Sequence, residues 1–338
     1  MNLCTGSIHI ALQFTSSAPR PQFKNMPAKV LSKSTPPSCQ KLYGRVVQSI
    51  TPFMQLSRLD MLCGSMLVFW PTAWSLTMAA RTEKLSLETY SIYLALSFIG
   101  SVVHHSVACV WNDIVDIELD RQVERTKKRP LARGAMGVSA ALVYAVPQAA
   151  FCLGLLYLTN PTAFFVGSVG LFFLDTVYPY MKRITYWPQA WLGIAINWGA
   201  LVSWTAVTSS DKIQPAVVLL AATWCWTMHY DTCYGAQDKK DDVKAGIKST
   251  ALLFKHNTHR VVAGFSASFL ALLAYAGYLN GQGAAFFFIS VIGCAFHLAW
   301  QLSRLNIDDS RSCFEIFSSN GNRLGYIVWL GCFVDYML

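Results

Sequence analysis

Two clusters of acidic residues, each followed by basic residues, are the segments of this sequence best suited to chemistry. The first is residues 111–134, WNDIVDIELDRQVERTKKRPLARG, and the second is residues 230–242, YDTCYGAQDKKDD. Positions three or four apart share one face of a helix. This spacing gives each cluster one oxygen-rich face, formed by Asn112, Asp113, Asp116 and Asp120 in the first and by Asp231, Tyr234, Asp238 and Asp242 in the second.

Carboxylates stacked on one helical face repel one another, so both faces require a shared counter-charge. Mg²⁺ suits oxygen ligands and typically binds one or two carboxylates together with the phosphate groups of a substrate. Basic side chains close behind the acids would bind the phosphate oxygens that a metal leaves exposed. The clusters therefore predict a Mg²⁺ site for a diphosphate. The simpler interpretation, solvated loop charges, is kept for Glu118, Glu124 and Asp241.

The rest of the chain is too apolar for a typical soluble protein, since 54% of its 338 residues are hydrophobic and only 13% are charged. A membrane-spanning helix needs about 20 apolar residues. Windows without Asp, Glu, Lys or Arg cover residues 61–80, 89–112, 134–174, 184–210, 213–230, 261–303 and 324–334. Turn-forming residues at 160–161 and 281–283 divide the two longest windows. We therefore predict an all-α, multi-spanning membrane protein with nine transmembrane helices.

The net charge of +9 indicates orientation in a lipid bilayer rather than a nucleic-acid partner. Basic residues concentrate in the loops around residues 113–133, 182 and 239, whereas the alternate loops hold few. We expect these three loops to lie on one side of the membrane. The ten cysteines are scattered singly, which predicts neither a zinc site nor a disulfide framework. Nothing in the sequence implies an obligate protein partner.

The N-terminus differs from the rest in composition, and we expect residues 1–45 to be a basic, disordered segment preceding one domain at residues 46–338. Residues 1–59 contain no Asp or Glu and several Ser, Thr and Pro. That composition fits a mitochondrial transit peptide, but Pro21 and Pro27 would interrupt an amphipathic helix. An endomembrane location (ER or Golgi) is therefore favoured, with the mitochondrial inner membrane as the alternative.

The two clusters resemble the paired motifs of the UbiA family of intramembrane prenyltransferases. NDIVDIELD resembles the motif N-D-x-x-D-x-x-x-D, and YDTCYGAQDKKDD resembles Y-D-x-x-Y-A-x-x-D-x-x-D-D. The likeness extends to RLDMLCGSMLVFWPTAW, RTKKRPLARG and YPYMKRITYWPQAWLG, and covers about residues 45 to 338. These blocks are similar to the 4-hydroxybenzoate polyprenyltransferase branch. QDKKDDVKAGIKSTALLF is similar to fungal members that farnesylate aromatic polyketides in meroterpenoid pathways.

This resemblance implies helices around a central cavity, a polar cap formed by the motif loops, and a lateral opening for a lipid tail. By motif position it implies that Mg²⁺ and the diphosphate bind at Asn112, Asp113, Asp116, Asp120, Asp238 and Asp242. Asp231, Tyr234 and Arg183 would be catalytic. The bases expected to bind substrate are Arg125, Lys127, Arg129, Lys182, Arg183 and Lys248. Among them, Lys182 and Arg183 would face an acceptor carboxylate or the leaving group.

The expected reaction transfers a prenyl group, with farnesyl preferred, from an allylic diphosphate to a carbon of a phenolic polyketide. Two departures from the family pattern bear on the identity of the acceptor. RLDMLCG stands where R-L-D-K-P-x-G is usual, and Gly235 stands where Ala is usual. The histidines at 104, 105 and 229 are expected to hydrogen-bond between helices rather than to act in catalysis.

Three alternatives remain open. The first is a 4-hydroxybenzoate polyprenyltransferase of mitochondrial ubiquinone synthesis. The second is a cation-coupled transporter, which should show inverted repeats and acids near the middle of the bilayer, whereas these acids lie at the ends of spans beside basic loops. The third, a structural lipid-binding protein, leaves the paired acidic faces without a role.

Overall fold

The computed structural model describes residues 37–208 and 212–338, with side chains from residue 44 onward. Contacts divide the chain into two compact units, residues 1–51 and residues 52–338. Helix α1 (Pro37–Leu56) begins in the first unit and ends in the second, and it includes residues 37–45 of the expected N-terminal segment. The remainder of the expected N-terminal segment lies outside the described residues.

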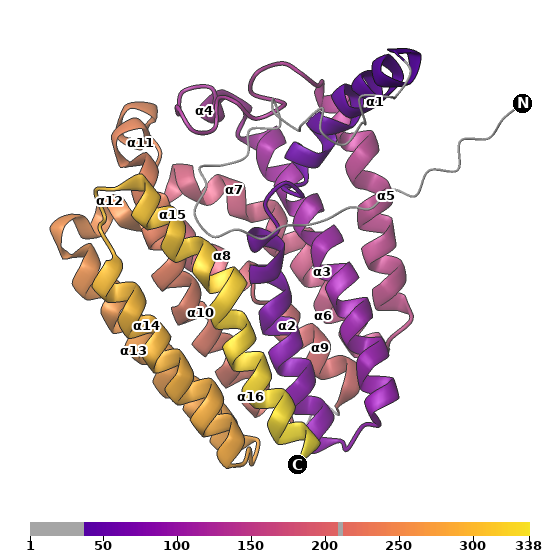
Figure 1. Ribbon diagram of the computed structural model, residues 1–338, viewed down its shortest axis with the longest axis vertical. Coiled ribbons are helices and arrows are strands. Elements are labelled where there is room, and N and C mark those ends of the chain that lie inside the picture. Colours follow the sequence, from indigo (N-terminus) through magenta and orange to yellow (C-terminus); the bar gives the residue numbers. More distant parts are fainter. Residues whose placement is uncertain (1–36, 209–211) are drawn as a thin grey trace, which may run out of the picture. The chain divides into compact units, whose positions relative to one another are not determined.

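Within the described ranges every regular element is a helix (Figure 1). The all-α class predicted from the sequence is therefore confirmed for these residues. The α-helices after α1 are α2 (Cys63–Thr82), α3 (Leu87–Val115), α4 (Ile117–Asp120), α5 (Val138–Tyr157), α6 (Pro161–Val169), α7 (Asp175–Ile184), α8 (Pro188–Ala195), α9 (Gly199–Val207), α10 (Gln214–Gly235), α11 (Lys239–Ala245), α12 (Thr250–Phe254), α13 (Thr258–Leu279), α14 (Gly293–Arg304), α15 (Ser310–Ser319) and α16 (Gly325–Met337).

Six of the described helical segments are long and apolar enough to cross a membrane. They are Leu87–Val115, Val138–Tyr157, Pro161–Ile184, Pro188–Val207, Thr250–Leu279 and Phe286–Arg304. The predicted windows 61–80, 213–230 and 324–334 do lie in helices α2, α10 and α16, but these helices are not among the six. The predicted count of nine spans is therefore not confirmed, whereas the multi-spanning class is.

Helix α2 lies in the core, where it packs against α3, α9 and α16. Nearly all of its residues are buried, as expected of a helix that is apolar around its whole circumference. The indole nitrogens of Trp70 and Trp74 donate to the carbonyl oxygens of Gly321 and Gly325, at 2.6 and 3.0 Å. These bonds satisfy both buried indoles and hold α2 against the start of α16.

Three of the helical segments contain short π-helical turns, at Gly170–Leu174, Phe286–Ile292 and Asn320–Leu324. Such turns shift the register of the residues that follow them and often occur at functional sites. The first joins α6 to α7 and ends immediately before Asp175. A carboxylate is thereby placed beside α3 in the interior of the second unit, where it meets His104.

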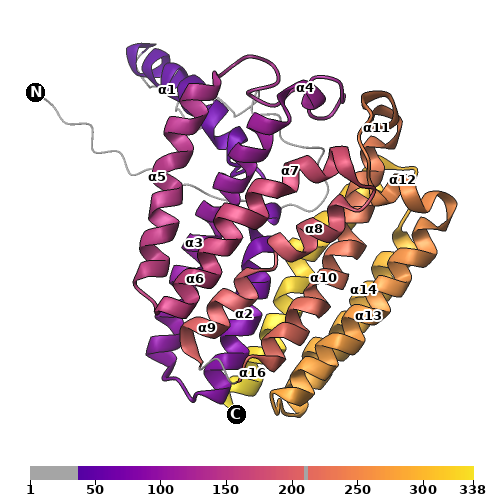
Figure 2. The same ribbon diagram turned by 180° about the vertical axis from the view of Figure 1, so that it is seen from behind.

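The motif-bearing segments gather at one end of the helices of the second unit. Figures 1 and 2 show α4, the loop after it and α11 at the same end as the last turns of α3 and α7. Ion pairs join these segments directly, for example between Arg125 and Asp238. The three basic loops therefore lie together, as the charge distribution predicted.

Candidate active site

A polar cavity of about 270 Å³ opens at this end of the helices, between the two motifs. It collects most of the predicted site residues although they are far apart in the sequence. Those that line it are Asn112, Asp116, Asp120, Arg125, Arg129, Lys182, Asp231, Tyr234, Asp238, Asp242 and Lys248. Three predicted residues, Asp113, Lys127 and Arg183, are not part of its wall.

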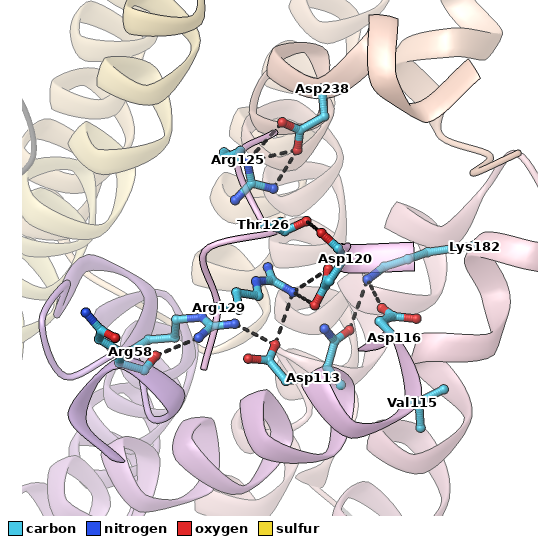
Figure 3. Close-up of polar contacts among 12 residues, drawn as sticks. Arg58, Asp113, Val115, Asp116, Asp120, Arg125, Thr126, Arg129, Lys182 and Asp238 are labelled. Carbon is cyan, nitrogen blue, oxygen red and sulfur yellow. Dashed lines mark hydrogen bonds and ion pairs between the residues drawn. The ribbon is translucent and has the colours of Figure 1, made fainter. Parts of the chain in front are cut away.

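The first motif places Asn112 in the last turn of α3 and Asp116 at the C-terminal end of that helix. Figure 3 shows Asp116 beside Lys182. Lys182, at the end of α7, donates from Nζ to Asn112 Oδ1 at 3.0 Å and to Asp116 Oδ2 at 2.7 Å. Arg183 donates to the other oxygen of Asp116 at 2.9 Å. One buried carboxylate thus holds two adjacent cations of α7.

Asp113 is completely buried and does not line the cavity. Its Oδ1 accepts from Arg58 at 2.6 Å and from Arg129 at 3.1 Å, while its Oδ2 has no hydrogen-bond partner among the described residues. Arg129 also bonds both oxygens of Asp120, at 3.0 and 2.8 Å. Arg58 and Arg129 both line the cavity. Asp113 therefore holds two cations of the cavity wall without lining the cavity itself.

The second motif is tied to the first by Arg125. Its Nε lies 3.0 and 2.9 Å from the two carboxylate oxygens of Asp238, and its NH1 group donates to the Tyr234 hydroxyl at 2.9 Å. The guanidinium carbon also lies 4.9 Å from the centre of the Tyr234 ring, which stacks on Phe317 at 4.2 Å. Arg125 and Tyr234 therefore hold each other in a fixed position in the cavity wall.

Two acids in the cavity wall have raised pKa values, because the site disfavours their charged form. Burial, and then the neighbouring carboxylate of Asp238, raise the pKa of Asp242 to about 7. Burial also raises the pKa of Asp120, against the opposing effect of Arg129. A cation bound beside these groups would favour their charged form. The electrostatics of the cavity thus suit an added positive charge.

The donor set is suitable for a hard divalent ion, although the acids are not arranged around one point. Among the described residues, His, Cys, Asp and Glu side chains form no group of three or more that could hold a metal ion. Each acid of the first motif is bonded to Arg or Lys instead. The side chains of the cavity wall nevertheless suit Mg²⁺ by their chemistry, because they offer carboxylate and amide oxygens.

A second side of the polar cavity is formed by α8, α10 and the loop before α12. Asp231, Gln189 and Lys248 line this side. Gln189 accepts from the backbone nitrogen of Thr250 at 3.0 Å, and Lys248 donates from Nζ to the carbonyl oxygen of Ile184 at 3.2 Å. Among the described residues, Lys248 has no carboxylate within ion-pair distance, unlike the other basic residues of the cavity wall.

Two of the predicted bases lie elsewhere. Lys127 pairs with Glu124 on the surface, where about half of its side chain is exposed. Arg183 faces Asp116 and the carbonyl oxygens of Val115 and Pro179. Periodicity alone could not assign these side chains, because Lys127 lies in the irregular segment after α4 and Arg183 lies in the last turn of α7, next to Lys182.

Several wall residues were not singled out from the sequence. Arg58, Tyr178 and Gln189 all line the cavity. Each lies in a block whose likeness to the family was noted, RLDMLCG or YPYMKRITYWPQAWLG, so the signal was present but had no assigned role. The pair formed by His104 and Asp175, with Nε2 and Oδ2 2.5 Å apart, lacked such a signal because Asp175 is isolated in the sequence.

A second, mostly apolar cavity of about 370 Å³ lies between α2, α3, α5, α6 and α9. It shares two wall residues, Val68 and His104, with the polar cavity. The two cavities therefore adjoin at the His104–Asp175 pair. Together they offer a charged compartment near the motifs and an apolar one deeper in the helices.

Comparison with known proteins agrees with this arrangement. Residues 68–324 match the model of the UbiA prenyltransferase family. The chain is 43% identical over 306 residues to the UbiA prenyltransferase claS of Ampulloclitocybe clavipes, covering 90% of this chain and 96% of that protein. It is 40% identical over 287 residues to the mitochondrial 4-hydroxybenzoate polyprenyltransferase of Schizosaccharomyces pombe, covering 84% and 80% of the two chains.

Solved structures show the same fold. A UbiA homolog from Aeropyrum pernix K1 superposes with a TM-score of 0.68 at 21% identity, over 80% of this chain and 98% of that one. A UbiA homolog from Archaeoglobus fulgidus bound to GPP and Mg²⁺ gives 0.66 at 16% identity, over 85% and 100%. The transporter alternative is thereby set aside. The chain belongs to the UbiA prenyltransferase family and is an intramembrane prenyltransferase.

Proposed function

We propose that this protein is a Mg²⁺-dependent aromatic prenyltransferase that moves a farnesyl group from farnesyl diphosphate to a ring carbon of a phenolic acid of polyketide origin. The observation that carries the proposal is the adjoining of the two cavities at His104. An allylic diphosphate has a charged head and an apolar tail. One compartment suits the head and the other suits the tail.

The diphosphate would be held by acids and bases of both motifs. Residues that would bind Mg²⁺ are Asn112, Asp116, Asp120, Asp238 and Asp242, all of which line the cavity. Bound Mg²⁺ would neutralise charge on the departing pyrophosphate. Arg58, Arg125, Arg129 and Lys182 would bind the remaining phosphate oxygens and stabilise the charge that develops as the bond between C1 and oxygen breaks.

We assign Asp113 a positioning role in place of the ligand role expected from the motif. Its carboxylate is buried behind Arg58 and Arg129 rather than in the cavity wall. A carboxylate that holds two cations by hydrogen bonds fixes their direction. Asp113 would therefore aim both guanidinium groups at the diphosphate.

The acceptor would bind on the side of Asp231, Gln189 and Lys248. When the C1–O bond breaks, its electron pair leaves with pyrophosphate, and a ring carbon of the phenol supplies the pair that forms the new C–C bond. Asp231 would accept a hydrogen bond from the phenol hydroxyl and make the ring more nucleophilic. The proton of the attacked carbon then leaves to a base or to pyrophosphate, which restores the aromatic ring.

Lys248 is the base best suited to a carboxylate on the acceptor. It lines the cavity and, within the described residues, lacks a carboxylate partner of its own. Arg183, which was expected to take this role together with Lys182, instead faces Asp116. A phenolic acid could therefore pair with Lys248 while its ring lies toward C1 of the donor.

The runner-up is the 4-hydroxybenzoate polyprenyltransferase reaction in the mitochondrial inner membrane. It shares the chemistry, because 4-hydroxybenzoate is also a phenolic acid, and several relatives 36–40% identical carry that name. The polyketide assignment, with an endomembrane location, rests on the likeness of QDKKDDVKAGIKSTALLF to the fungal farnesylating members. The chain is also more similar to the A. clavipes UbiA prenyltransferase, at 43% identity, than to the S. pombe enzyme, at 40% identity.

Product analysis tests the proposal. Purified protein in lipid vesicles would be given Mg²⁺, donors from C10 to C30 and a panel of phenolic acids, with products identified by mass spectrometry. We expect a farnesylated phenolic polyketide acid and no turnover after removal of Mg²⁺ with EDTA. Preferred turnover of 4-hydroxybenzoate with a C30 donor would favour the runner-up. No prenylated phenol from any pair would contradict the proposed function.

A further inference from the structure

The apolar cavity is lined on one side by a regular row of α3 residues. Ile92, Leu96, Gly100 and His104 follow at steps of four and all line it. Each step of four residues advances about 6 Å along a helix. Gly100 is the one member of this row without a side chain, and it lies one turn from the junction at His104.

Four glycines line this cavity, and three of them are explained by packing. A Cβ atom at Gly167, Gly170 or Gly199 would come within 2.5, 2.7 or 2.2 Å of a neighbouring side chain. At Gly100 it would meet only Leu155 Cδ1, at 3.4 Å, an ordinary contact with the end of a flexible side chain. The space in front of Gly100 thus belongs to the cavity.

Gly100 has no evident structural advantage. It lies in the interior of a 29-residue helix, where glycine is the least favourable residue apart from proline. No positive φ angle occurs at this position. A residue without a side chain in the cavity wall does, however, leave room for a bound prenyl chain to extend past it.

The depth of Gly100 corresponds to one particular part of the donor. With the diphosphate at Asn112, His104 lies about 12 Å and Gly100 about 18 Å further along α3, at about 1.5 Å per residue. An extended chain advances about 1.2 Å per bond, so each isoprene unit adds about 5 Å. If C1 of the donor lies about 5 Å beyond Asn112 along α3, the second isoprene unit ends about 15 Å from Asn112 and the third about 20 Å from it. Only the third unit reaches Gly100.

We propose that Gly100 is the chain-length determinant of this enzyme, because its missing side chain admits the third isoprene unit of the donor. This inference rests on the proposed function. It predicts that a branched side chain at position 100 converts a preference for farnesyl diphosphate into one for geranyl diphosphate.

The test compares Gly100→Leu with the wild-type protein in vesicles, using C5, C10, C15 and C20 diphosphates and one acceptor. We expect kcat/KM for the C15 donor to fall by about tenfold or more, because a few carbons of the donor would no longer fit the apolar cavity. We expect kcat/KM for the C10 donor to change by less than about threefold. Gly100→Ala should show a smaller loss in the same direction. Ile99→Phe is the matched control, because Ile99 adjoins Gly100 but is exposed and does not line the cavity.

A binding measurement separates this inference from the proposed reaction. Thermal stabilisation by the unreactive thiolo analogues of geranyl and farnesyl diphosphate, with Mg²⁺, reports donor selection without an acceptor. A farnesyl-to-geranyl ratio that falls in Gly100→Leu and not in Ile99→Phe supports the role of Gly100 even if no phenol is prenylated. An unchanged ratio, or equal losses for both chain lengths, would overturn it.

Discussion

Arg125 and Asp238 connect the two motifs through a forked interaction between residues 113 positions apart in the chain. Nε of Arg125 contacts both carboxylate oxygens, its NH2 group lies 2.5 Å from Oδ2, and its NH1 group remains for Tyr234. Only the planar guanidinium group offers donors in this arrangement. This side chain therefore joins the two halves of the cavity wall, alongside the hydrogen bond from the Glu124 backbone nitrogen to Asp241 Oδ2 at 3.1 Å.

Replacement of Arg125 by Lys should separate this geometry from charge. Lys keeps the positive charge but cannot contact both Asp238 and Tyr234 as a fork. We expect Arg125→Lys to lower kcat/KM for the donor by about tenfold or more, since hydrogen bonds to charged groups contribute about 1.5 to 3 kcal/mol. Lys127→Ala is the control, because Lys127 pairs with Glu124 on the surface. Wild-type kinetics in Arg125→Lys would show that the fork is dispensable.

Removal of an acid in the cavity wall should abolish turnover. Asp116→Ala, Asp238→Ala and Asp242→Ala each remove a proposed ligand from a site with few to spare. Activity would be measured as pyrophosphate release at increasing Mg²⁺ concentrations. Glu118→Ala should retain activity, since Glu118 is largely exposed and pairs with Arg121. Near wild-type turnover of Asp116→Ala at saturating Mg²⁺ would refute the metal site.

Asp113 should give a different pattern from the acids of the wall. Asp113→Asn weakens the hold on Arg58 and Arg129 but removes no oxygen from the cavity. We expect a higher KM for the donor, by about tenfold, with an unchanged Mg²⁺ concentration for half-maximal activity. A parallel rise in the Mg²⁺ concentration for half-maximal activity would show that Asp113 is a Mg²⁺ ligand.

Lys248 and Arg183 form a matched pair of tests for the acceptor. Lys248→Ala should raise the KM of a phenolic acid by about tenfold, because it removes a charge-assisted hydrogen bond, and leave the KM of the donor nearly unchanged. Arg183→Ala should act mainly on the donor, because Arg183 holds Asp116. A phenol without a carboxylate serves as the control substrate and should not respond to Lys248→Ala. The opposite pattern for the two variants would exchange their roles.

The packing of α2 against α16 predicts a stability effect without a direct effect on chemistry. A Cβ atom at Gly325 would lie 2.0 Å from the buried ring of Trp70. We expect Gly325→Ala to lower the unfolding free energy by about 1 to 3 kcal/mol, as overpacked cores do, measured as a lower Tm in detergent. Gly154→Ala is the control, since a Cβ atom there meets nothing within 4 Å. Equal Tm values for the two variants would show that α16 can shift to make room.

The class of the protein and its reacting motifs could be read from the sequence. Long charge-free runs predict buried or membrane-spanning helices, because their composition is a local property. The spacing of Asn112, Asp116 and Asp120 predicts that they share one helical face, and the structure places all three in the cavity wall. The number of spans could not be read in this way, because α2 and α10 are as poor in charge as a membrane span, yet most of their residues are buried inside the protein.

Only the tertiary structure decided which way each side chain faces. Asp113 adjoins Asn112 in the sequence, yet it does not line the cavity, and its buried carboxylate bonds Arg58 and Arg129 instead. The junction at His104 likewise requires Asp175, which the π-helical turn before α7 brings beside α3. Helical periodicity determines which residues share a face, but the packing of neighbouring helices determines whether that face meets a cavity, a partner side chain or lipid.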